Sequence, residues 1–219
     1  MTSLRVIAID GAAGSGKSTL ARGLARSLGV AYVNTGVMYR ALTLAALEDG
    51  VDPEDADALA ELMRRLRFGL STGTAPELEV EGSAPSPELE SEQVEAHVST
   101  VARHPEVRAL MRVAQRALGV PDAVVEGRDI GTVVFPDAPV KLYLTAANQM
   151  RAERRAEDRD EPDHGVARSL RERDARDARV NRFEPAPGAI VLDTSDRTIG
   201  ETLEEALAIV RERLPEVSP

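Results

Sequence analysis

The stretch of sequence that decides the fold is residues 11–18, which read Gly11-Ala12-Ala13-Gly14-Ser15-Gly16-Lys17-Ser18. It fits the pattern G-x-x-x-x-G-K-[ST], in which glycines let successive backbone N–H groups turn toward phosphate oxygens. An apolar run precedes it at residues 4–10, and leucines follow it at positions 20, 24 and 28, the spacing of one helix face. The sequence therefore predicts a strand, a phosphate-binding loop and a helix whose N-terminus adds partial positive charge.

A loop of this kind holds the phosphates of a nucleotide, which we expect to be ATP with Mg²⁺. The loop residues up to Thr19 would contact the phosphates, Lys17 would bridge the β- and γ-phosphates, and the Ser18 hydroxyl would bind Mg²⁺. The alternative is a glycine-rich turn between a strand and a helix, with an exposed lysine. The sequence has no guanine-reading N-K-x-D pattern, which disfavours a GTPase. A small chain with this loop points instead to a small-molecule kinase.

Outside the loop, short apolar runs alternate with stretches of helical spacing. Strands are predicted at residues 31–33, 123–125, 140–144 and 189–192, in addition to 4–10. Helical spacing covers residues 36–47, 52–66, 88–103, 105–118 and most of 147–182, and a last helix follows a capping box formed by Thr198 and Glu201. This alternation predicts an α/β fold: a three-layer kinase core in which helices flank a central parallel sheet of five strands.

The composition excludes several classes of protein. The chain has 219 residues, no cysteine and a formal net charge of −10. Without cysteine there are no disulfides, thiolate nucleophiles or cysteine-based zinc sites, which fits a reducing compartment, and we expect a cytoplasmic protein. No apolar run approaches the length of a membrane span, and the acidic charge disfavours nucleic-acid binding. We expect a monomer that binds small nucleotides.

Two further segments resemble motifs of bacterial cytidylate kinases, enzymes of the P-loop nucleoside monophosphate kinase superfamily. Residues 34–40 read Asn-Thr-Gly-Val-Met-Tyr-Arg, which is similar to [DN]-[ST]-G-x-x-Y-R. Residues 126–136 read Glu-Gly-Arg-Asp-Ile-Gly-Thr-Val-Val-Phe-Pro, which is similar to G-R-D-[IM]-G-T-x-V-x-P. Together with the phosphate loop and residues 173–177, the resemblance covers nearly the whole chain.

The resemblance implies that the γ-phosphate of ATP is transferred to CMP, with dCMP as a second acceptor. An acceptor monophosphate is a dianion, and arginines on both sides can neutralise it with paired hydrogen bonds. Arg40 and Arg128, which both lie inside the motifs, are expected to do this. The remaining residues that the resemblance assigns are Thr35 and Tyr39 in the acceptor pocket, Ser99, Arg108 and Asp129 on the cytosine, and Arg173 and Asp177 on the sugar.

We expect two excursions from a core that comprises residues 1–62 and 101–219. Residues 63–100 would form a monophosphate-binding insertion, and residues 151–176 a short helical lid within the core. Closure of both over the substrates would exclude water, which is a competing acceptor for the γ-phosphate.

The lid and the strand ends supply the last expected roles. The lid arginines that could stabilise the charge on the transferred phosphoryl group are Arg151, Arg154, Arg155 and Arg159, and we expect Arg151 and Arg155 to do so. Glu126 is expected to hold Mg²⁺ through water. The chain departs from the family pattern at Val180, where a last arginine is usual, and at Glu90, where an arginine is frequent. The candidates to replace the missing arginine are Arg179 and Arg182.

Two other interpretations stay open at this stage. The chain could phosphorylate another small acceptor, such as a different nucleoside monophosphate or shikimate, which activity measurements across acceptors would distinguish. It could instead be a non-catalytic ATP-binding switch, which would bind ATP tightly without turnover and expose an apolar patch. A nucleic-acid-binding module is disfavoured because basic and aromatic residues do not interleave.

Overall fold

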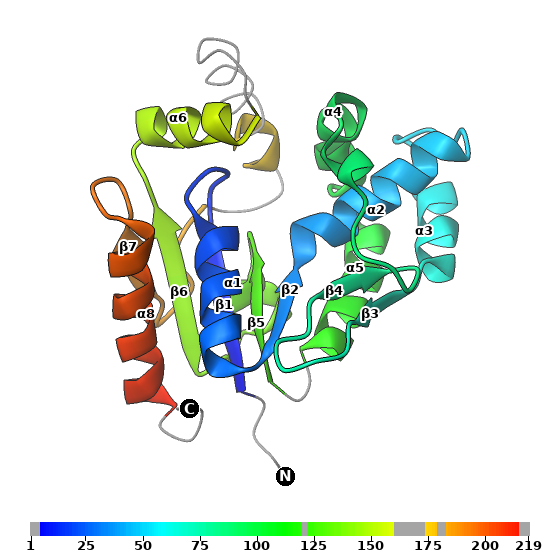
Figure 1. Ribbon diagram of the computed structural model, residues 1–219. Helices are drawn as coiled ribbons and strands as arrows, with labels where there is room; N and C mark the ends of the chain where they lie inside the picture. The colour runs from blue at the N-terminus through cyan, green and yellow to red at the C-terminus, as the bar shows by residue number, and fades with distance from the viewer. Residues whose placement is uncertain (1–4, 120–121, 160–173, 179–182, 215–219) are drawn as a thin grey trace.

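The computed structural model describes residues 5–119, 122–159, 174–178 and 183–214. At its centre lies a sheet of five parallel strands in the order β2-β5-β1-β6-β7. The strands are β1 (Arg5–Gly11), β2 (Ala31–Asn34), β5 (Asp122–Gly127), β6 (Val140–Thr145) and β7 (Ile190–Asp193). The α/β fold and the five predicted strands are therefore confirmed (Figure 1).

The register of the strands brings polar residues together at one edge of the sheet. Asp10, near the end of β1, is opposite Gly127 of β5, and Asn34 of β2 is opposite Glu126. Because the strands are parallel, their carboxyl ends lie at the same edge, where open α/β sheets usually bind ligands. The phosphate loop and both motifs begin at this edge.

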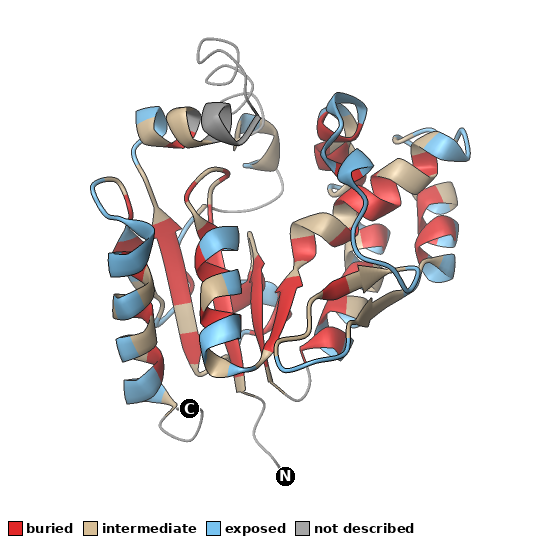
Figure 2. Ribbon diagram, in the orientation of Figure 1, coloured by how far each residue is buried: buried red, intermediate tan, exposed pale blue. Residues whose placement is uncertain are grey.

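Helices cover both faces of the sheet, and β1 shows this through its alternating side chains. Ile7 and Ile9 pack against the first and last helices, whereas Val6 and Ala8 face the opposite layer. The helices are α1 (Lys17–Leu28) and α8 (Ile199–Arg213) on one face, and α2 (Thr35–Glu48), α3 (Ala56–Arg65) and α5 (Pro105–Leu118) on the other. Figure 2 shows that the strands and inner helix faces are buried. The three predicted layers are confirmed.

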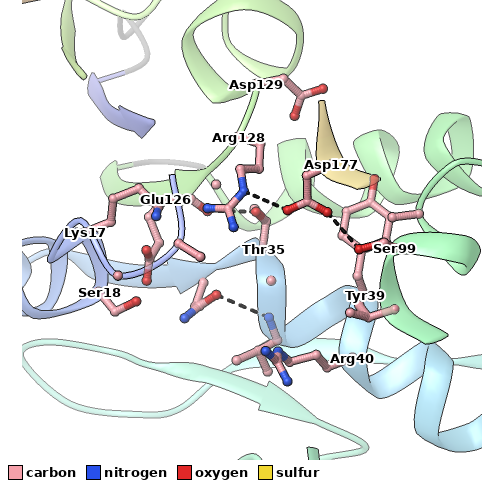
Figure 3. Close-up of a pocket in the computed structure, with 18 of the residues that line it drawn as sticks. Lys17, Ser18, Thr35, Tyr39, Arg40, Ser99, Glu126, Arg128, Asp129 and Asp177 are labelled. Atoms are coloured by element: carbon pink, nitrogen blue, oxygen red, sulfur yellow. Dashed lines mark hydrogen bonds and ion pairs between the residues drawn. The ribbon is translucent and has the colours of Figure 1, made fainter. Parts of the chain in front are cut away.

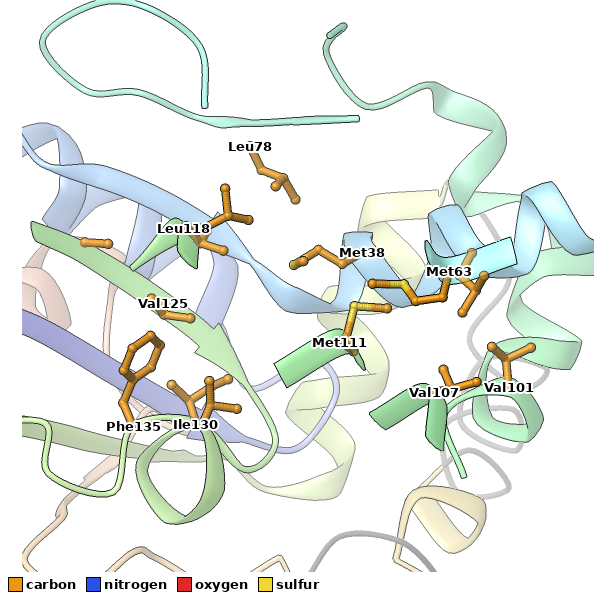
Figure 4. Close-up of a cluster of buried hydrophobic side chains, with 14 of the residues drawn as sticks. Met38, Met63, Leu78, Val101, Val107, Met111, Leu118, Val125, Ile130 and Phe135 are labelled. Atoms are coloured by element: carbon orange, nitrogen blue, oxygen red, sulfur yellow. The ribbon is translucent and has the colours of Figure 1, made fainter. Parts of the chain in front are cut away.

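The layer formed by α2, α3 and α5 contains a core of its own. Met38, Met63 and Met111, one from each helix, are fully or almost fully buried in it and lie together in Figure 4. Leu78 of β4 (Leu78–Val80) packs against the same cluster, and β4 pairs antiparallel with β3 (Phe68–Leu70). These two short strands are thus anchored to the core. A 3₁₀ turn, η1 (Pro87–Glu90), and α4 (Glu92–Val101) follow.

Two boundaries differ from the sequence expectation. The helix expected from residue 52 begins at Ala56, because the Asp55 side chain accepts a hydrogen bond from the Ala58 N–H at 3.0 Å and caps it there. The segment after β5, for which no helix was predicted, contains a π-helical turn, η2 (Ile130–Val134).

Two helices predicted in the C-terminal part of the chain are present. Part of the segment predicted as helical at residues 147–182 forms α6 (Asn148–Arg159), and the capping box of Thr198 and Glu201 starts α8. Within the ranges described, no helix is long and apolar enough to cross a membrane.

Candidate active site

The phosphate loop joins the end of β1 to the start of α1. Gly16 is the N-cap of α1 and has φ +85°, a left-handed conformation that glycine adopts without the steric cost of a side chain. The N–H groups of the first helical turn therefore point toward the loop without a side-chain cap, which suits an anion. Gly11 has no room for a side chain, because a Cβ there would lie 2.3 Å from the backbone oxygen of Leu144.

Three cationic side chains donate hydrogen bonds to three consecutive carbonyl oxygens of this loop. The pairs are Arg128 with Gly11 at 2.8 Å, Lys17 with Ala12 at 2.7 Å, and Arg151 with Ala13 at 2.9 Å. The cations come from the end of β5, from α1 and from α6, so distant parts of the chain converge here. Positive charge is therefore concentrated at the sheet edge where an anionic ligand would lie.

A pocket at this edge is lined by the phosphate loop and by both motifs. Figure 3 shows Lys17, Ser18 and Glu126 on one side of it, and Tyr39 and Ser99 on the other. The predicted site residues that line the pocket are Ala13, Gly14, Lys17, Ser18, Thr35, Tyr39, Arg40, Ser99, Arg108, Glu126, Arg128, Asp129 and Asp177. The fold thus brings together residues that are up to 164 positions apart in the sequence, from Ala13 to Asp177.

Arg40 is buried and held by the segment that precedes α5. Its guanidinium donates to Glu95 Oε2 at 2.7 Å and to the backbone oxygen of Leu89 at 2.9 Å, and Glu90 Oε2 lies 3.5 Å away. Glu95, itself buried on α4, was not found by sequence reasoning. A signal existed, because Glu95 is an acid between the buried positions Val94 and Val98 of an amphipathic helix.

The acids and bases at the far side of the pocket are paired with one another. Arg108 Nη2 donates to Asp129 Oδ2 at 2.5 Å, which joins α5 to the start of η2. Asp177 accepts from Arg128 Nε at 3.2 Å and from the Ser99 hydroxyl at 2.8 Å. Asp177 therefore links the chain after β5 to α4. Burial raises the pKa of Tyr39, which lines the same pocket, to about 12, so this phenol stays neutral at physiological pH.

Glu126 is buried, and both its backbone and its side chain accept hydrogen bonds. Its backbone oxygen accepts from the Thr35 hydroxyl at 2.7 Å, and its carboxylate accepts from the Tyr32 hydroxyl at 2.6 Å. Burial, and then the adjacent Glu126 carboxylate, raise the pKa of Tyr32 far above its ordinary value, so Tyr32 is a permanent donor. Sequence reasoning did not single out Tyr32.

Asp10 connects the phosphate loop to η2. Its two carboxylate oxygens accept from the N–H groups of Ile130 and Gly131, each at 2.7 Å. Burial is the largest influence and raises the pKa of Asp10 to about 6, although these two hydrogen bonds oppose it. Asp10 was treated only as the end of a strand; the signal was a carboxylate on an otherwise apolar run.

Other predicted residues either do not line the pocket or lie outside the described residues. Arg173 and the candidates around Val180 lie outside the described residues, as does the side chain of Arg155. Arg151 is described but does not line the pocket; besides the loop, it contacts Asp174 at 2.7 Å and Asn148 at 2.6 Å. It lies between α6 and the phosphate loop.

Comparison with known proteins places this site in a family. A family model described as cytidylate kinase matches residues 7–212. The chain belongs to the cytidylate kinase family. The resemblance predicted from the motifs, and with it the class of nucleoside monophosphate kinases that use ATP, is confirmed.

Individual relatives are similar to this chain over almost their full length. The cytidylate kinase of Mycobacterium avium is 43% identical over 220 residues, which is 95% of this chain and 96% of the relative. That of Deinococcus radiodurans is 43% identical and covers 92% and 97% of the two chains. A crystal structure titled TT1252, from Thermus thermophilus, is 23% identical with a TM-score of 0.50, and it covers 95% of this chain and 97% of its own. That structural likeness supports the fold alone.

Proposed function

We propose that this chain transfers the γ-phosphate of ATP to CMP, and also to dCMP, giving ADP and CDP or dCDP. The observation that carries the proposal is the pocket, because the phosphate loop and the residues expected to bind the acceptor line one continuous space. Donor and acceptor bound there would meet at the carboxyl edge of the sheet, which is the geometry that direct transfer requires.

The donor side would act mainly through its backbone. The N–H groups of the phosphate loop and of the first turn of α1 would hold the β- and γ-phosphates. Lys17, which donates to the loop carbonyl of Ala12 in this structure, would exchange that contact for phosphate oxygens. The Ser15 hydroxyl is further evidence for a polar ligand at the loop. It is fully buried and has no hydrogen-bond partner among the described residues.

The residues present fit Mg²⁺. The Ser18 hydroxyl and the Glu126 carboxylate line the same pocket, and both offer hard oxygen donors. Mg²⁺ is usually held by one or two such protein groups together with phosphates and water. We assign Ser18 and, through water, Glu126 to this ion. When bound, Mg²⁺ would neutralise charge on the β- and γ-phosphates.

The acceptor phosphate would be positioned by Arg40 and Arg128. One of its oxygens attacks the γ-phosphorus, a new P–O bond forms, and the bond to the β-phosphate oxygen breaks, so that ADP leaves without a covalent enzyme intermediate. Both guanidiniums are largely buried, where their charge is poorly screened. Arg40 would exchange part of its present contact with Glu95 for the phosphate.

The Arg108–Asp129 pair offers a donor and an acceptor side by side, and this suits cytosine. The amino group of cytosine would donate to Asp129, and its ring nitrogen and carbonyl oxygen would accept from Arg108. Uracil carries a carbonyl where cytosine carries the amino group, so it would place an acceptor against the Asp129 carboxylate. An unmatched buried pair of this kind costs substantial binding energy, which favours CMP over UMP.

The sugar would lie beside Asp177, whose carboxylate already accepts a hydrogen bond from the Ser99 hydroxyl. A ribose hydroxyl could donate to Asp177 in the same way. The roles of Arg173, Arg151 and Arg155, and the division into a core, an insertion at 63–100 and a lid at 151–176, remain predictions.

The test is ADP release by the purified chain with Mg²⁺ and ATP, measured separately with CMP, dCMP, UMP, AMP, GMP and shikimate. We expect strong turnover with CMP and dCMP and weaker turnover with UMP. Turnover with another acceptor alone would overturn the roles of Arg108 and Asp129 while keeping the kinase chemistry. ATP binding without turnover on any acceptor would overturn the proposal.

A further inference from the structure

Tyr32 lies beneath the pocket on the face of the sheet that α1 covers. It packs in the apolar cluster that contains Leu20 and Leu24 of α1, and its side chain is almost fully buried. Asn34, two residues further along β2, is opposite Glu126 of β5. Because side chains alternate along a strand, Tyr32, Asn34 and Glu126 share this face. The helix α1, which begins with Lys17 and Ser18, covers this same face.

The hydrogen bonds among these three side chains can run in only one direction. The Asn34 side-chain oxygen accepts from the Val37 N–H at 3.2 Å and caps α2, so its amide nitrogen must be the atom that faces Tyr32. That nitrogen donates to the Tyr32 oxygen at 3.3 Å. The Tyr32 proton is therefore directed to Glu126 Oε1, 2.6 Å away.

We propose that Tyr32 is a positioning residue for the bound magnesium ion, acting through Glu126. Its hydroxyl holds one carboxylate oxygen of Glu126, while Thr35 holds the backbone of the same residue. Both contacts fix the carboxylate before a ligand arrives, so that its other oxygen can accept from the water around the ion. Groups that act on a metal ion from outside its ligand shell, as Glu126 would through water, commonly contribute ten- to a hundredfold to metal affinity. Because Tyr32 acts one step further from the ion, we expect its contribution at the lower end of this range. This inference rests on the role assigned to Glu126 under the proposed function.

The ring of Tyr32 makes packing contacts of its own, so the role of the hydroxyl can be tested separately from that of the ring. Its ring is buried against α1, and the Arg22 guanidinium lies 5.0 Å from the ring centre. A phenylalanine would keep these ring contacts and lose only the hydrogen bond to Glu126. The substitution Tyr32→Phe therefore isolates the proposed role.

The experiment measures ADP binding by titration calorimetry with Mg²⁺ and with EDTA, together with the Mg²⁺ concentration at half-maximal turnover. In Tyr32→Phe we expect that concentration to rise roughly tenfold. Mg²⁺ should strengthen ADP binding less than in the wild type, whereas binding in EDTA should be unchanged. Tyr143→Phe is the matched control, because Tyr143 is also buried but lies on β6 and outside the pocket, and it should behave as the wild type.

Further variants separate the possible failures. Glu126→Gln should raise the Mg²⁺ concentration at half-maximal turnover at least as much as Tyr32→Phe does. If Glu126→Gln has no effect, the assignment of Glu126 is wrong; if only Tyr32→Phe has none, the present inference is wrong. Equal loss of ADP binding with Mg²⁺ and with EDTA would show that Tyr32 only packs. Should Tyr32→Phe not fold, Asn34→Ser keeps a helix cap, removes the donor to Tyr32 and should shift the Mg²⁺ dependence in the same direction.

Discussion

The two sides of the pocket are built in different ways. The donor side is one contiguous segment of eight residues, the last two of which begin α1, and most of what it offers a ligand is backbone. The acceptor side is assembled from α2, α4, α5, the start of η2 and residue 177, and it offers side chains that hold one another. The donor side therefore depends on local conformation, and the acceptor side on how the whole fold is packed.

This difference separates two kinds of change. A substitution on the donor side should affect chemistry with every acceptor, because the γ-phosphate is common to all of them. A substitution on the acceptor side should change the choice among acceptors and leave ATP binding intact. Asp10 belongs to both sides, because it lies next to the phosphate loop and its carboxylate holds the first residues of η2.

The largest effect is expected from Lys17→Met. Removing the cation that meets the β- and γ-phosphates should lower kcat by about 10³-fold with every acceptor. The KM for CMP should change little. The chain offers a matched control, because Lys141 is its other lysine and lies away from the pocket. Lys141→Met should retain wild-type kcat, and a loss restricted to one acceptor in Lys17→Met would contradict the separation of the two sides.

Asp10 should make stability depend on pH. The pKa of its carboxyl is about 6 in the folded chain, against an ordinary 3.8, mainly because of burial. Between these values the unfolded chain has lost the proton while the folded chain retains it, so the free energy of unfolding should fall as pH rises through this window. The fall is on the order of 3 kcal/mol, since one pKa unit corresponds to about 1.4 kcal/mol.

Urea unfolding of the wild type and of Asp10→Asn across this window provides the measurement. The variant cannot titrate at this position, while the two nearest charges, Asp129 and Lys17, are present in both proteins. The difference between the two free energies should therefore follow the titration of Asp10. Parallel curves would show that the pKa of Asp10 is not raised.

On the acceptor side, Asp129→Asn should reduce selectivity. A hydrogen bond to a charged group contributes roughly 1.5–3 kcal/mol, so kcat/KM for CMP should fall about 30-fold. The value for UMP should fall less, because a neutral amide can donate to a carbonyl, and the KM for ATP should be unchanged. Asp137→Asn, an exposed acid nearby, is the control. Equal losses for CMP and UMP would show that Asp129 does not read the base.

The same difference explains what could be predicted from the sequence. The phosphate loop was predictable because its function lies in contiguous glycines and a helix start. Motif matches also located Arg128 and Asp129, and the wider family resemblance located Arg108, but neither showed which side chains contact one another. The contact between Arg40 and Glu95 spans 55 positions, and that between Tyr32 and Glu126 spans 94. Such pairs depend on strand register and helix packing, which local patterns do not contain.

The π-helical turn η2 was missed for a related physical reason. Five residues are too few for a periodic pattern, and the turn is held by the Asp10 carboxylate, about 120 positions earlier in the chain. By contrast, the capping box at the start of α8 was predictable because both of its partners lie within four residues of each other.

That capping box allows the smallest predicted effect, on a helix that contributes no residue to the pocket. Thr198→Ala removes the side chain that accepts from the Glu201 N–H, so thermal or urea unfolding should show a loss of about 1 kcal/mol. Because no residue of α8 lines the pocket, kcat and both KM values should stay at wild-type levels below the unfolding temperature. Thr198→Ser, which keeps the cap, should restore most of the lost stability. A change in the KM for CMP without one for ATP would mean that packing across the sheet reaches the acceptor side, and the pocket's dependence on the whole fold would then extend to its outermost layer.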